Sequence, residues 1–328
     1  MLEFLNQDKG TVSVSMACLV TGGGGFIGSH LVDGLLLRGD KVRVLDDFST
    51  GLRSNLAHVE SQVEIQTGTI TDAKTVGRAM QGIQVVYHLG ALASVARSVE
   101  NPPLSHAACA TGTLHVLDEA RKAGVKRVVF AASSSAYGGS SRETGQEEDQ
   151  PLVALSPYAA AKLAGEFYMQ AFAHTYGIET VRLRFFNIFG PRQRADSPYS
   201  GVIAIFMSLM SQGLPVTVHG DGLQSRDFTY VANAVQALTK AALTPGISGK
   251  VYNVGTGRNI TVLDLVFALN KILNTNLTAM HGPARAGDPR FSLANITNTC
   301  RDLGYRPEVG LEEGLSRTYE WYQSLKKK

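Results

Sequence analysis

A tyrosine and a lysine four residues apart are the side chains of this sequence best suited to acid–base chemistry. Tyr158 and Lys162 lie in the stretch SPYAAAKLAGEFYMQAFA. Ser156 is a favourable N-cap, Pro157 suits the first helical position, and the alanines that follow are strong helix formers. The stretch therefore predicts a helix that carries both side chains on one face, one turn apart.

This pair can supply a base at neutral pH. A phenol has a pKa near 10, and lowering that pKa to about 7 takes roughly 4 kcal/mol. One cation about 4 Å away supplies roughly that amount at an effective dielectric constant of about 20. Lys162 can therefore make a phenolate of Tyr158. On its own the pair is also explained by an amphipathic helix with an incidental Tyr and Lys, so the interpretation depends on the rest of the chain.

The first part of the chain has the pattern of a dinucleotide site. Residues Ala17–Thr21 form a short apolar run that ends in GGGGFIG at 22–28. A helical pattern follows and closes at Gly39, and Lys41–Asp46 reads as a second strand. A strand, a glycine turn, a helix and a strand with a terminal acid are together typical of a dinucleotide-binding unit.

The glycines allow the backbone to approach a pyrophosphate, and the helix N-terminus offers it free N–H groups. Two registers fit the sequence: Gly22, Gly25 and Gly28, or Gly23, Gly25 and Gly28. Asp46 follows at about the spacing of an acid that accepts from the adenosine ribose hydroxyls and repels a 2′-phosphate. The cofactor predicted here is NAD rather than NADP.

Further strand and helix patterns follow at Val63–Gln66, Ala73–Gln81, Val85–Leu89, Thr113–Ala123, Arg127–Ala132 and Thr180–Phe186. Repeated strand–helix units predict an α/β fold with a Rossmann-type, doubly wound parallel sheet. After Gly190 the pattern loosens. We expect residues 1–188 to form the NAD-binding domain, with parts of 229–255 returning to it, and residues 189–328 to form a smaller α/β substrate domain.

The composition is that of an ordinary globular protein: 328 residues, 44% hydrophobic, 18% charged, formal net charge +3. Only residues 326–328 form a basic run, so no nucleic-acid partner is expected. Cys18, Cys109 and Cys300 are far apart, which predicts no disulfide framework and no metal site, and favours a reducing cytoplasm. No apolar stretch has transmembrane length, so no membrane association is expected.

Six motifs occur in order along the chain: Thr21–Gly28, SSSAYG at 133–138, the Tyr158/Lys162 pair, RFFN at 184–187, RDF at 226–228 and RAGD at 285–288. Together they resemble the extended short-chain dehydrogenase/reductases, and among these the UDP-hexose 4-epimerases. The resemblance extends from Ala17 to about Trp321, nearly the whole chain.

The resemblance implies a catalytic group made of Ser133, Tyr158 and Lys162. Tyr158 would take the proton of the sugar 4-hydroxyl, while Lys162 lowers the Tyr158 pKa and holds the nicotinamide ribose. Ser133 would hydrogen-bond the 4-oxygen. Hydride would pass from sugar C4 to NAD, and the 4-keto sugar would turn over and take the hydride back on its other face. A hydroxyl donor and a tuned phenol suit such a step.

The resemblance also implies which residues bind the two ligands. Those for NAD are Gly22, Gly25, Phe26, Ile27, Gly28, Asp46, Asp47, Phe48, Ser49, Thr50, Gly51, Thr69, Ile70, Leu89, Gly90, Ala91, Ala131, Tyr158, Lys162, Phe185 and Ile188. Those for a UDP-sugar are Ser94, Val95, Ser133, Ser134, Ser135, Tyr158, Asn187, Val202, Thr217, His219, Arg226, Arg285, Asp288 and Ser292. Two of these roles have an alternative. Arg226 could form a surface ion pair with Asp227 instead of binding the diphosphate, and His219 could be a loop histidine whose hydrogen bonds are made within the protein.

Three positions narrow the choice of reaction and of substrate. The resembling dehydratases and decarboxylases carry acids where this chain has Ser134 or Ser135, so epimerisation is favoured. The position four residues past Asp288 gates the sugar pocket in the family, and here it is Ser292. A small side chain favours UDP-GlcNAc and UDP-GalNAc, or their uronic acid forms.

Alternatives remain open. They are a UDP-glucose 4-epimerase, another NAD-dependent oxidoreductase, and a non-catalytic NAD-binding protein. Cys109, Thr69 and Ala93 depart from the residues usual in the family, which affects individual cofactor contacts rather than the catalytic group. The resemblance further implies a homodimer that packs the helices at 105–123 and 158–176 against their copies.

Overall fold

The computed structural model describes residues 15–140, 144–195, 200–284 and 289–326. Its centre is a seven-stranded sheet with the order β11-β6-β5-β4-β1-β2-β3, in which all neighbours run parallel. The strands are β1 (Ala17–Thr21), β2 (Lys41–Asp46), β3 (Val63–Thr67), β4 (Val85–His88), β5 (Arg127–Ser133), β6 (Glu179–Phe185) and β11 (Val251–Val254). This confirms the predicted doubly wound fold.

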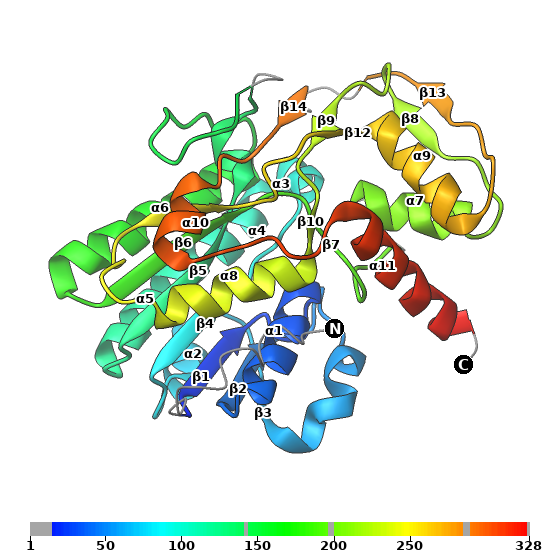
Figure 1. Ribbon diagram of the computed structural model, residues 1–328. Helices are drawn as coiled ribbons and strands as arrows, with labels where there is room; N and C mark the ends of the chain where they lie inside the picture. The colour runs from blue at the N-terminus through cyan, green and yellow to red at the C-terminus, as the bar shows by residue number, and fades with distance from the viewer. Residues whose placement is uncertain (1–14, 141–143, 196–199, 285–288, 327–328) are drawn as a thin grey trace.

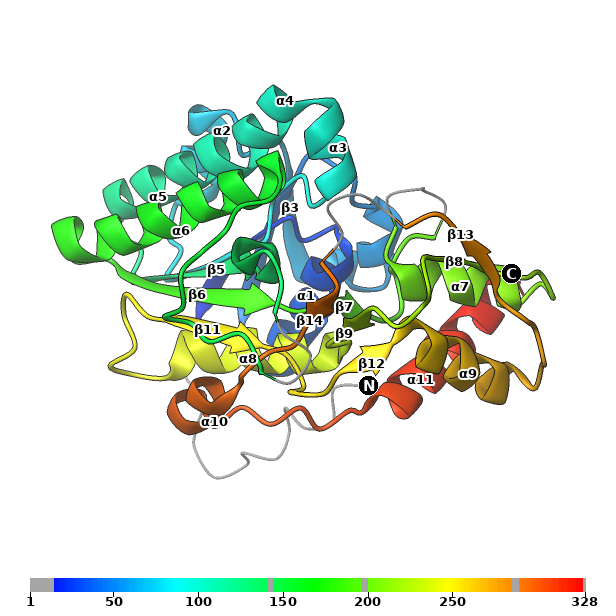
Figure 2. The ribbon, with the colours of Figure 1, turned by 90° about the horizontal axis from the view of Figure 1, so that it is seen from above.

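Helices cover both faces of the sheet (Figures 1 and 2). On one face lie α1 (Phe26–Leu37) and α8 (Val231–Leu243), and on the other lie α2 (Ala73–Ala79), α5 (Gly112–Lys122) and α6 (Pro157–Tyr176). Because both faces are covered, central strands read as continuous apolar runs. In β4, for example, every residue is buried.

The direction of winding reverses beside β1, which has β2 on one side and β4 on the other. Such a switch point is where doubly wound sheets bind ligands, beyond the carboxyl ends of the strands. Thr21 stands opposite His88 at this edge, and Ser133 stands opposite Phe185. The last residues of four strands therefore line one edge.

Helix α6 begins and ends as its sequence predicts. The Ser156 hydroxyl accepts from the Ala159 N–H, Pro157 occupies the first turn, and Gly177 closes the helix with φ +69°. Gly165 lets α6 approach the sheet closely, since a Cβ there would lie 3.0 Å from the Phe130 ring. The helix that carries Tyr158 and Lys162 is thus fixed in length and in its contact with β5.

The later part of the chain adds three small sheets, β10-β7, β12-β9-β14 and β13-β8. Its elements are β7 (Ile188–Phe189), α7 (Val202–Met210), β8 (Thr217–His219), β9 (Ser225–Arg226), β10 (Thr229–Tyr230), β12 (Ile260–Thr261), α9 (Val262–Leu273), β13 (Met280–Gly282), β14 (Phe291–Ser292), α10 (Thr297–Leu303) and α11 (Leu311–Lys326). Figure 1 shows α7, α9, α11, β8 and β13 gathered at one end of the molecule. Between β10 and β12 the chain returns to the large sheet, where α8 packs on α1 and β11 pairs with β6.

The remaining helical pieces are η2 (Arg53–Gln62), α3 (Val95–Glu100), α4 (Pro102–His106), a π-helical turn η3 (Ala107–Thr111) and η4 (Ser134–Tyr137). The run from α3 through η3 leads into α5 and contacts α6 along its way. This run lies beside the start of α6 and so beside Tyr158.

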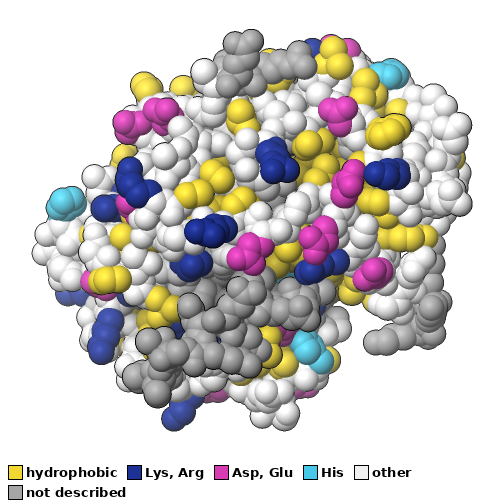
Figure 3. Space-filling view, in the orientation of Figure 1, with side chains coloured by type: hydrophobic (Ala, Val, Ile, Leu, Met, Phe, Trp, Pro, Cys, Tyr) yellow, Lys and Arg dark blue, Asp and Glu magenta, His cyan; other side chains and the backbone are white. Residues whose placement is uncertain are grey.

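The surface carries mixed charge. On the face drawn in Figure 3, Lys and Arg side chains are scattered among acidic and apolar ones. Within the described ranges, no helix is both long and apolar enough to cross a membrane. In those same ranges, no three His, Cys, Asp or Glu side chains gather as metal ligands would.

Candidate active site

The glycine turn between β1 and α1 is tightly packed at several of its glycines. A Cβ on Gly22 would lie 2.8 Å from the Gly90 nitrogen, and a Cβ on Gly28 would lie 2.1 Å from the Gly22 carbonyl oxygen. The Gly25 N–H donates to that same oxygen at 3.1 Å. A Cβ on Gly23 would likewise lie 2.7 Å from the Val44 side chain, so close approaches fall on Gly22, Gly23 and Gly28 and involve glycines of both predicted registers.

The start of α1 suits a pyrophosphate. Its N-cap, Gly25, makes no side-chain cap hydrogen bond, and no acidic residue lies in the first turn. The N–H groups of a first helical turn lack partners within the helix and attract anions. Because no side chain occupies that place, the turn fits the phosphates of the predicted NAD.

Asp46 lies at the end of β2 and is 8% exposed. Its Oδ2 accepts from the Gly24 N–H and its Oδ1 from the Phe48 N–H, each at 2.8 Å. Burial raises the pKa of this carboxyl, and the two backbone donors act against that effect. A carboxylate has about four acceptor positions, so two are left for ribose hydroxyls. The residue thus braces the glycine turn and can still accept from a ribose.

The other residues predicted for NAD follow the ends of neighbouring strands. Residues 47–51 follow β2, Thr69 and Ile70 follow β3, and residues 89–91 follow β4. Ala131 lies in β5, while Phe185 ends β6 and Ile188 begins β7. The fold brings them to one edge of the sheet, at the switch point.

Ser133, Tyr158 and Lys162 come together where β5 ends beside α6. The Ser133 hydroxyl lies near enough to the Tyr158 phenol to lower its pKa. It also accepts from the Ser135 hydroxyl at 2.9 Å. Lys162 is buried, its Nζ donates to the Ala131 carbonyl at 2.9 Å, and it lies 4.7 Å from the centre of the Phe130 ring.

The pKa of Tyr158 is influenced by burial and by neighbours other than Lys162. Burial, and after it the neighbouring Cys109 thiol, raise the pKa of Tyr158, while the Ser133 hydroxyl lowers it. Lys162 is turned toward the Ala131 carbonyl, and burial lowers the pKa of its own ammonium. In the chain by itself, burial is the largest influence on the pKa of Tyr158, and the group that lowers this pKa is Ser133.

A buried ion pair holds α6 to β6. The Arg184 guanidinium meets the Glu166 carboxylate at 2.7 Å, with both side chains almost fully buried. Arg184 also donates to the Tyr137 hydroxyl at 2.8 Å, and that hydroxyl donates to Asn253 at 2.6 Å. Sequence reasoning gave Glu166 no role. Its position one turn after Lys162, together with the arginine of the RFFN motif, is the signal that could have found it.

The residues predicted for the sugar and nucleotide come from several elements. Ser134 and Ser135 lie in η4, Ser94 caps α3, Val95 and Val202 begin α3 and α7, Thr217 and His219 lie on β8, and Asn187 precedes β7. Arg226 and Ser292 are paired neighbours of β9 and β14. Arg285 and Asp288 lie outside the described residues. The later part of the chain thus brings Arg226 and Ser292 side by side.

Asp227 organises this part of the site, although sequence reasoning weighed it only as a partner of Arg226. It is fully buried and accepts from the Thr256 N–H and hydroxyl at 2.8 and 2.7 Å. It also accepts from the N–H groups of Gly257 at 2.9 Å and Ala294 at 3.3 Å. Burial raises the pKa of its carboxyl. Asp227 thereby ties β9 to the loop after β11 and to the end of β14.

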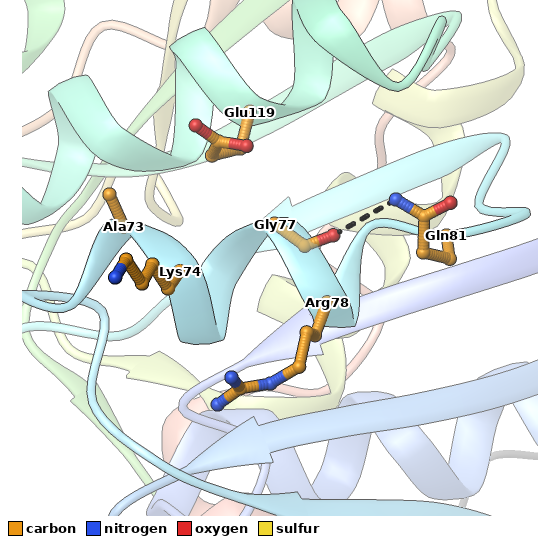
Figure 4. Close-up of a pocket in the computed structure, with 6 residues that line it drawn as sticks. All are labelled: Ala73, Lys74, Gly77, Arg78, Gln81 and Glu119. Carbon is orange, nitrogen blue, oxygen red and sulfur yellow. Dashed lines mark hydrogen bonds between the residues drawn. The ribbon is translucent and has the colours of Figure 1, made fainter.

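A shallow hollow of about 550 Å³ lies between α2 and α5 (Figure 4). Its lining residues are Ala73, Lys74, Gly77, Arg78, Gln81 and Glu119. The Gln81 side chain donates to the Gly77 carbonyl at 3.3 Å across its rim. The hollow shares no residue with the sets predicted for NAD or for the sugar.

A doubly wound sheet with a glycine turn at its switch point, and a Ser–Tyr–Lys group beyond β5, is the arrangement of the extended short-chain dehydrogenase/reductases. A family model described as "NAD dependent epimerase/dehydratase family" matches residues 18–255. The chain therefore belongs to the NAD-dependent epimerase/dehydratase family, and its cofactor is NAD.

Individual relatives agree with this over nearly the full chain. The UDP-glucose 4-epimerase of Mycolicibacterium smegmatis is 36% identical, over 94% of this chain and 99% of its own. A Thermus thermophilus UDP-glucose 4-epimerase in complex with NAD matches with a TM-score of 0.87 and 36% identity, covering 94% and 99% of the two chains. The UDP-N-acetylglucosamine 4-epimerase of Methanobrevibacter ruminantium, in complex with UDP-N-acetylmuramic acid, matches with a TM-score of 0.90 and 34% identity, covering 95% and 99%.

Proposed function

We propose that this protein interconverts UDP-sugars that differ in configuration at C4, and that UDP-GlcNAc and UDP-GalNAc are its substrate pair. The observation that carries the proposal is the grouping of Ser133, Tyr158 and Lys162 at the carboxyl end of β5, on the same edge of the sheet as the glycine turn that follows β1. The relatives above, two UDP-glucose 4-epimerases and a UDP-N-acetylglucosamine 4-epimerase, support the reaction class.

Each side chain then has a role at the sugar. Tyr158 takes the proton of the 4-hydroxyl, and Ser133 donates a hydrogen bond to the oxygen as it becomes a carbonyl. NAD, when bound, would supply the hydride acceptor and, in its oxidised form, a positive charge. Burial raises the pKa of Tyr158 in the chain alone, and a nearby positive charge would act in the opposite direction. Lys162 holds the cofactor ribose from its place against Ala131.

The residues beside Ser133 support epimerisation over elimination. Ser134 and Ser135 form the short helix that follows β5, and the Ser135 hydroxyl and N–H both bind Ser133, at 2.9 and 3.2 Å. A 4-keto sugar held here meets hydroxyl groups at positions 134 and 135 where the resembling dehydratases and decarboxylases have acids. With no acid at these positions to promote elimination or decarboxylation, the 4-keto sugar is reduced again.

The N-acetyl preference rests on Ser292. This side chain is 8% exposed and lies on β14 directly beside Arg226 of β9. A serine leaves more room there than an aromatic ring, enough for an acetamido group. UDP-glucose is the second candidate, because relatives of that activity are 36% identical to this chain.

The purified protein, incubated separately with UDP-GlcNAc, UDP-glucose and the uronic acid of UDP-GlcNAc, tests this function by proton NMR of the anomeric region. We expect new galacto-configured signals without added NAD being consumed, fastest with UDP-GlcNAc. Ser292→Tyr should lower kcat/KM for UDP-GlcNAc by at least about tenfold and spare UDP-glucose, since overfilling a pocket affects only the larger ligand. Equal losses on both substrates would contradict the role of Ser292.

We also propose a homodimer and a cytoplasmic site of action. Phe167 and Tyr176 on α6 are 59% and 52% exposed, as an unpaired apolar helix face would be. Cys18 and Cys109 are free and buried, which suits a reducing compartment. Sedimentation of the wild type and of Phe167→Glu tests the dimer. Two copies are expected to separate in the variant, and a monomeric wild type contradicts the proposal.

A further inference from the structure

A buried histidine beneath the glycine turn joins three parts of the predicted site. His88 is the last residue of β4 and has no exposed surface. Its Nδ1 lies 2.8 Å from the Thr21 hydroxyl, and its Nε2 lies 3.0 Å from the Thr113 hydroxyl. The imidazole also stacks on Phe130, with the ring centres 5.4 Å apart. Hydrogen bonds and packing therefore fix the ring in position and in rotation.

The partners of the two threonines decide the direction of each hydrogen bond. The Thr113 hydroxyl donates to the Cys109 carbonyl at 2.7 Å, so its oxygen is left to accept from Nε2. The Gly90 N–H donates to the Thr21 oxygen at 3.1 Å, so the Thr21 hydrogen is left for Nδ1. A neutral imidazole with its proton on Nε2 gives every donor and acceptor in this series of hydrogen bonds a partner.

The surroundings keep the imidazole neutral. Burial lowers the pKa of His88 to about 3, and the Lys162 ammonium acts in the same direction. That ammonium lies over the same Phe130 ring on which His88 stacks. An imidazolium at this place would add a second buried positive charge and would lose the acceptor atom that faces Thr21.

The series of hydrogen bonds through Thr21, His88 and Thr113 begins at the Gly90 N–H and ends at the Cys109 carbonyl. Both of these ends lie in the predicted site. At one end, the Gly90 backbone packs against Gly22, where a Cβ would lie only 2.8 Å from the Gly90 nitrogen. At the other end is Cys109 of the π-helical turn η3, which packs in one cluster with Tyr158 and Ala91. These hydrogen bonds thus connect the backbone beside the predicted pyrophosphate site with the residues around the predicted base.

We propose that His88 is a positioning residue that holds the Gly90 backbone and the turn at Cys109 in fixed relation, so that the NAD site and Tyr158 keep their separation. His88 would act through these groups and touch neither ligand. The inference rests on the proposed function for the role of Tyr158, while its consequence for NAD does not depend on which sugar is used.

Three variants test the individual hydrogen bonds made by His88 and Thr113. His88→Phe keeps a flat ring for the stack on Phe130 and removes both hydrogen bonds. Thr113→Val removes the hydroxyl that accepts from His88 Nε2 and donates to the Cys109 carbonyl, and leaves the bond between His88 and Thr21 in place. Thr113→Ser restores the hydroxyl. Thr239→Val is the matched control, because Thr239 in α8 is also buried and also donates to a carbonyl four residues earlier, that of Val235, at 2.9 Å.

The NAD-loaded wild type and variants are compared by the rate at which bound NAD is released, by kcat and KM, and by thermal unfolding. We expect His88→Phe and Thr113→Val to release NAD about tenfold faster, as a buried donor or acceptor loses its partner. Their kcat should fall with KM for the sugar unchanged, and Thr113→Ser should recover both quantities. Thr239→Val should lower only the unfolding temperature.

The proposal is overturned if Thr113→Val and His88→Phe lower the unfolding temperature as Thr239→Val does and leave NAD release and kcat unchanged. If His88→Phe does not fold, the two Thr113 variants decide by the same readouts. A wild type that converts no UDP-sugar would refute the proposed function, and the NAD release rates would still decide the role of His88.

Discussion

At the scale of single residues, the site is governed by the cost of placing charge in the interior. Burial raises the pKa of Tyr158 and lowers the pKa of Lys162, so each group in the chain alone is held toward its neutral form. The Ser133 hydroxyl opposes this at Tyr158 by lowering the pKa of the phenol. In the proposed reaction, the positive charge of oxidised NAD would favour the phenolate form of Tyr158.

Replacing the base therefore isolates its contribution. Tyr158→Phe keeps the ring and removes the phenol oxygen, and we expect kcat to fall by about 10²–10⁴, the usual range for a general base. Retention of NAD and the unfolding temperature should change little. Tyr168→Phe is the control, since Tyr168 lies on the same helix and is 38% exposed. Activity of Tyr158→Phe within a few-fold of the wild type, measured by the NMR assay, would exclude Tyr158 as the base.

At the scale of elements, the position of α6 depends on a buried ion pair as well as on apolar packing. Glu166 and Arg184 are 2% and 3% exposed at their side chains, and the guanidinium is satisfied further by Tyr137. Buried charges are tolerated only when they are paired and hydrogen-bonded. This network sets the register of α6 along β6 and so the place of Tyr158 over the end of β5.

Breaking that pair should be costly for stability. Glu166→Ala leaves the Arg184 guanidinium buried without its carboxylate, and we expect the free energy of unfolding to fall by about 3–5 kcal/mol in urea titrations. The comparison is Glu179→Ala, which removes the partner of Arg127 at a carboxylate that is 45% exposed. There we expect a loss of about 1 kcal/mol or less. Similar losses in the two variants would show that the buried pair does not fix α6.

The elements also show what the sequence could predict. Each strand from β1 to β6 was recognisable because apolar runs and glycine turns recur at regular intervals, and Ser156 with Pro157 marked the start of α6. The short strands β8, β9 and β14 were not, because two or three residues carry no periodicity. The π-helical turn at 107–111 was also missed, since its five residues carry no periodicity of their own and the turn packs on α6, a contact that local sequence does not encode. The ordered motifs nevertheless indicated the Ser133, Tyr158 and Lys162 group, which the fold brings together.

At the scale of the whole molecule, two buried histidines make stability depend on pH. Burial lowers the pKa of His30 to about 4 and that of His88 to about 3. In the unfolded chain each would titrate near 6.5. Below pH 6.5 the unfolded state therefore binds protons that the folded state does not, so stability is fully present above that pH and is lost as the pH falls toward 4.

Between pH 7 and pH 5 we expect the free energy of unfolding to fall by roughly 2 kcal/mol for each of the two histidines. Urea titrations at both pH values measure this. His30→Phe, which cannot titrate, should show about half the pH dependence of the wild type. A wild type that is equally stable or more stable at pH 5 would contradict the burial of two neutral histidines.

In the proposed reaction, the C4 hydrogen would leave the sugar as hydride, be held on the enzyme by bound NAD, and return to the same carbon. UDP-GlcNAc labelled with deuterium at C4 tests this most directly when it is incubated in ordinary water with the protein as purified. We predict UDP-GalNAc that keeps the deuterium at C4, formed more slowly than from unlabelled substrate. Conversion with loss of the label to water, or no conversion by protein that still carries NAD, would contradict the account.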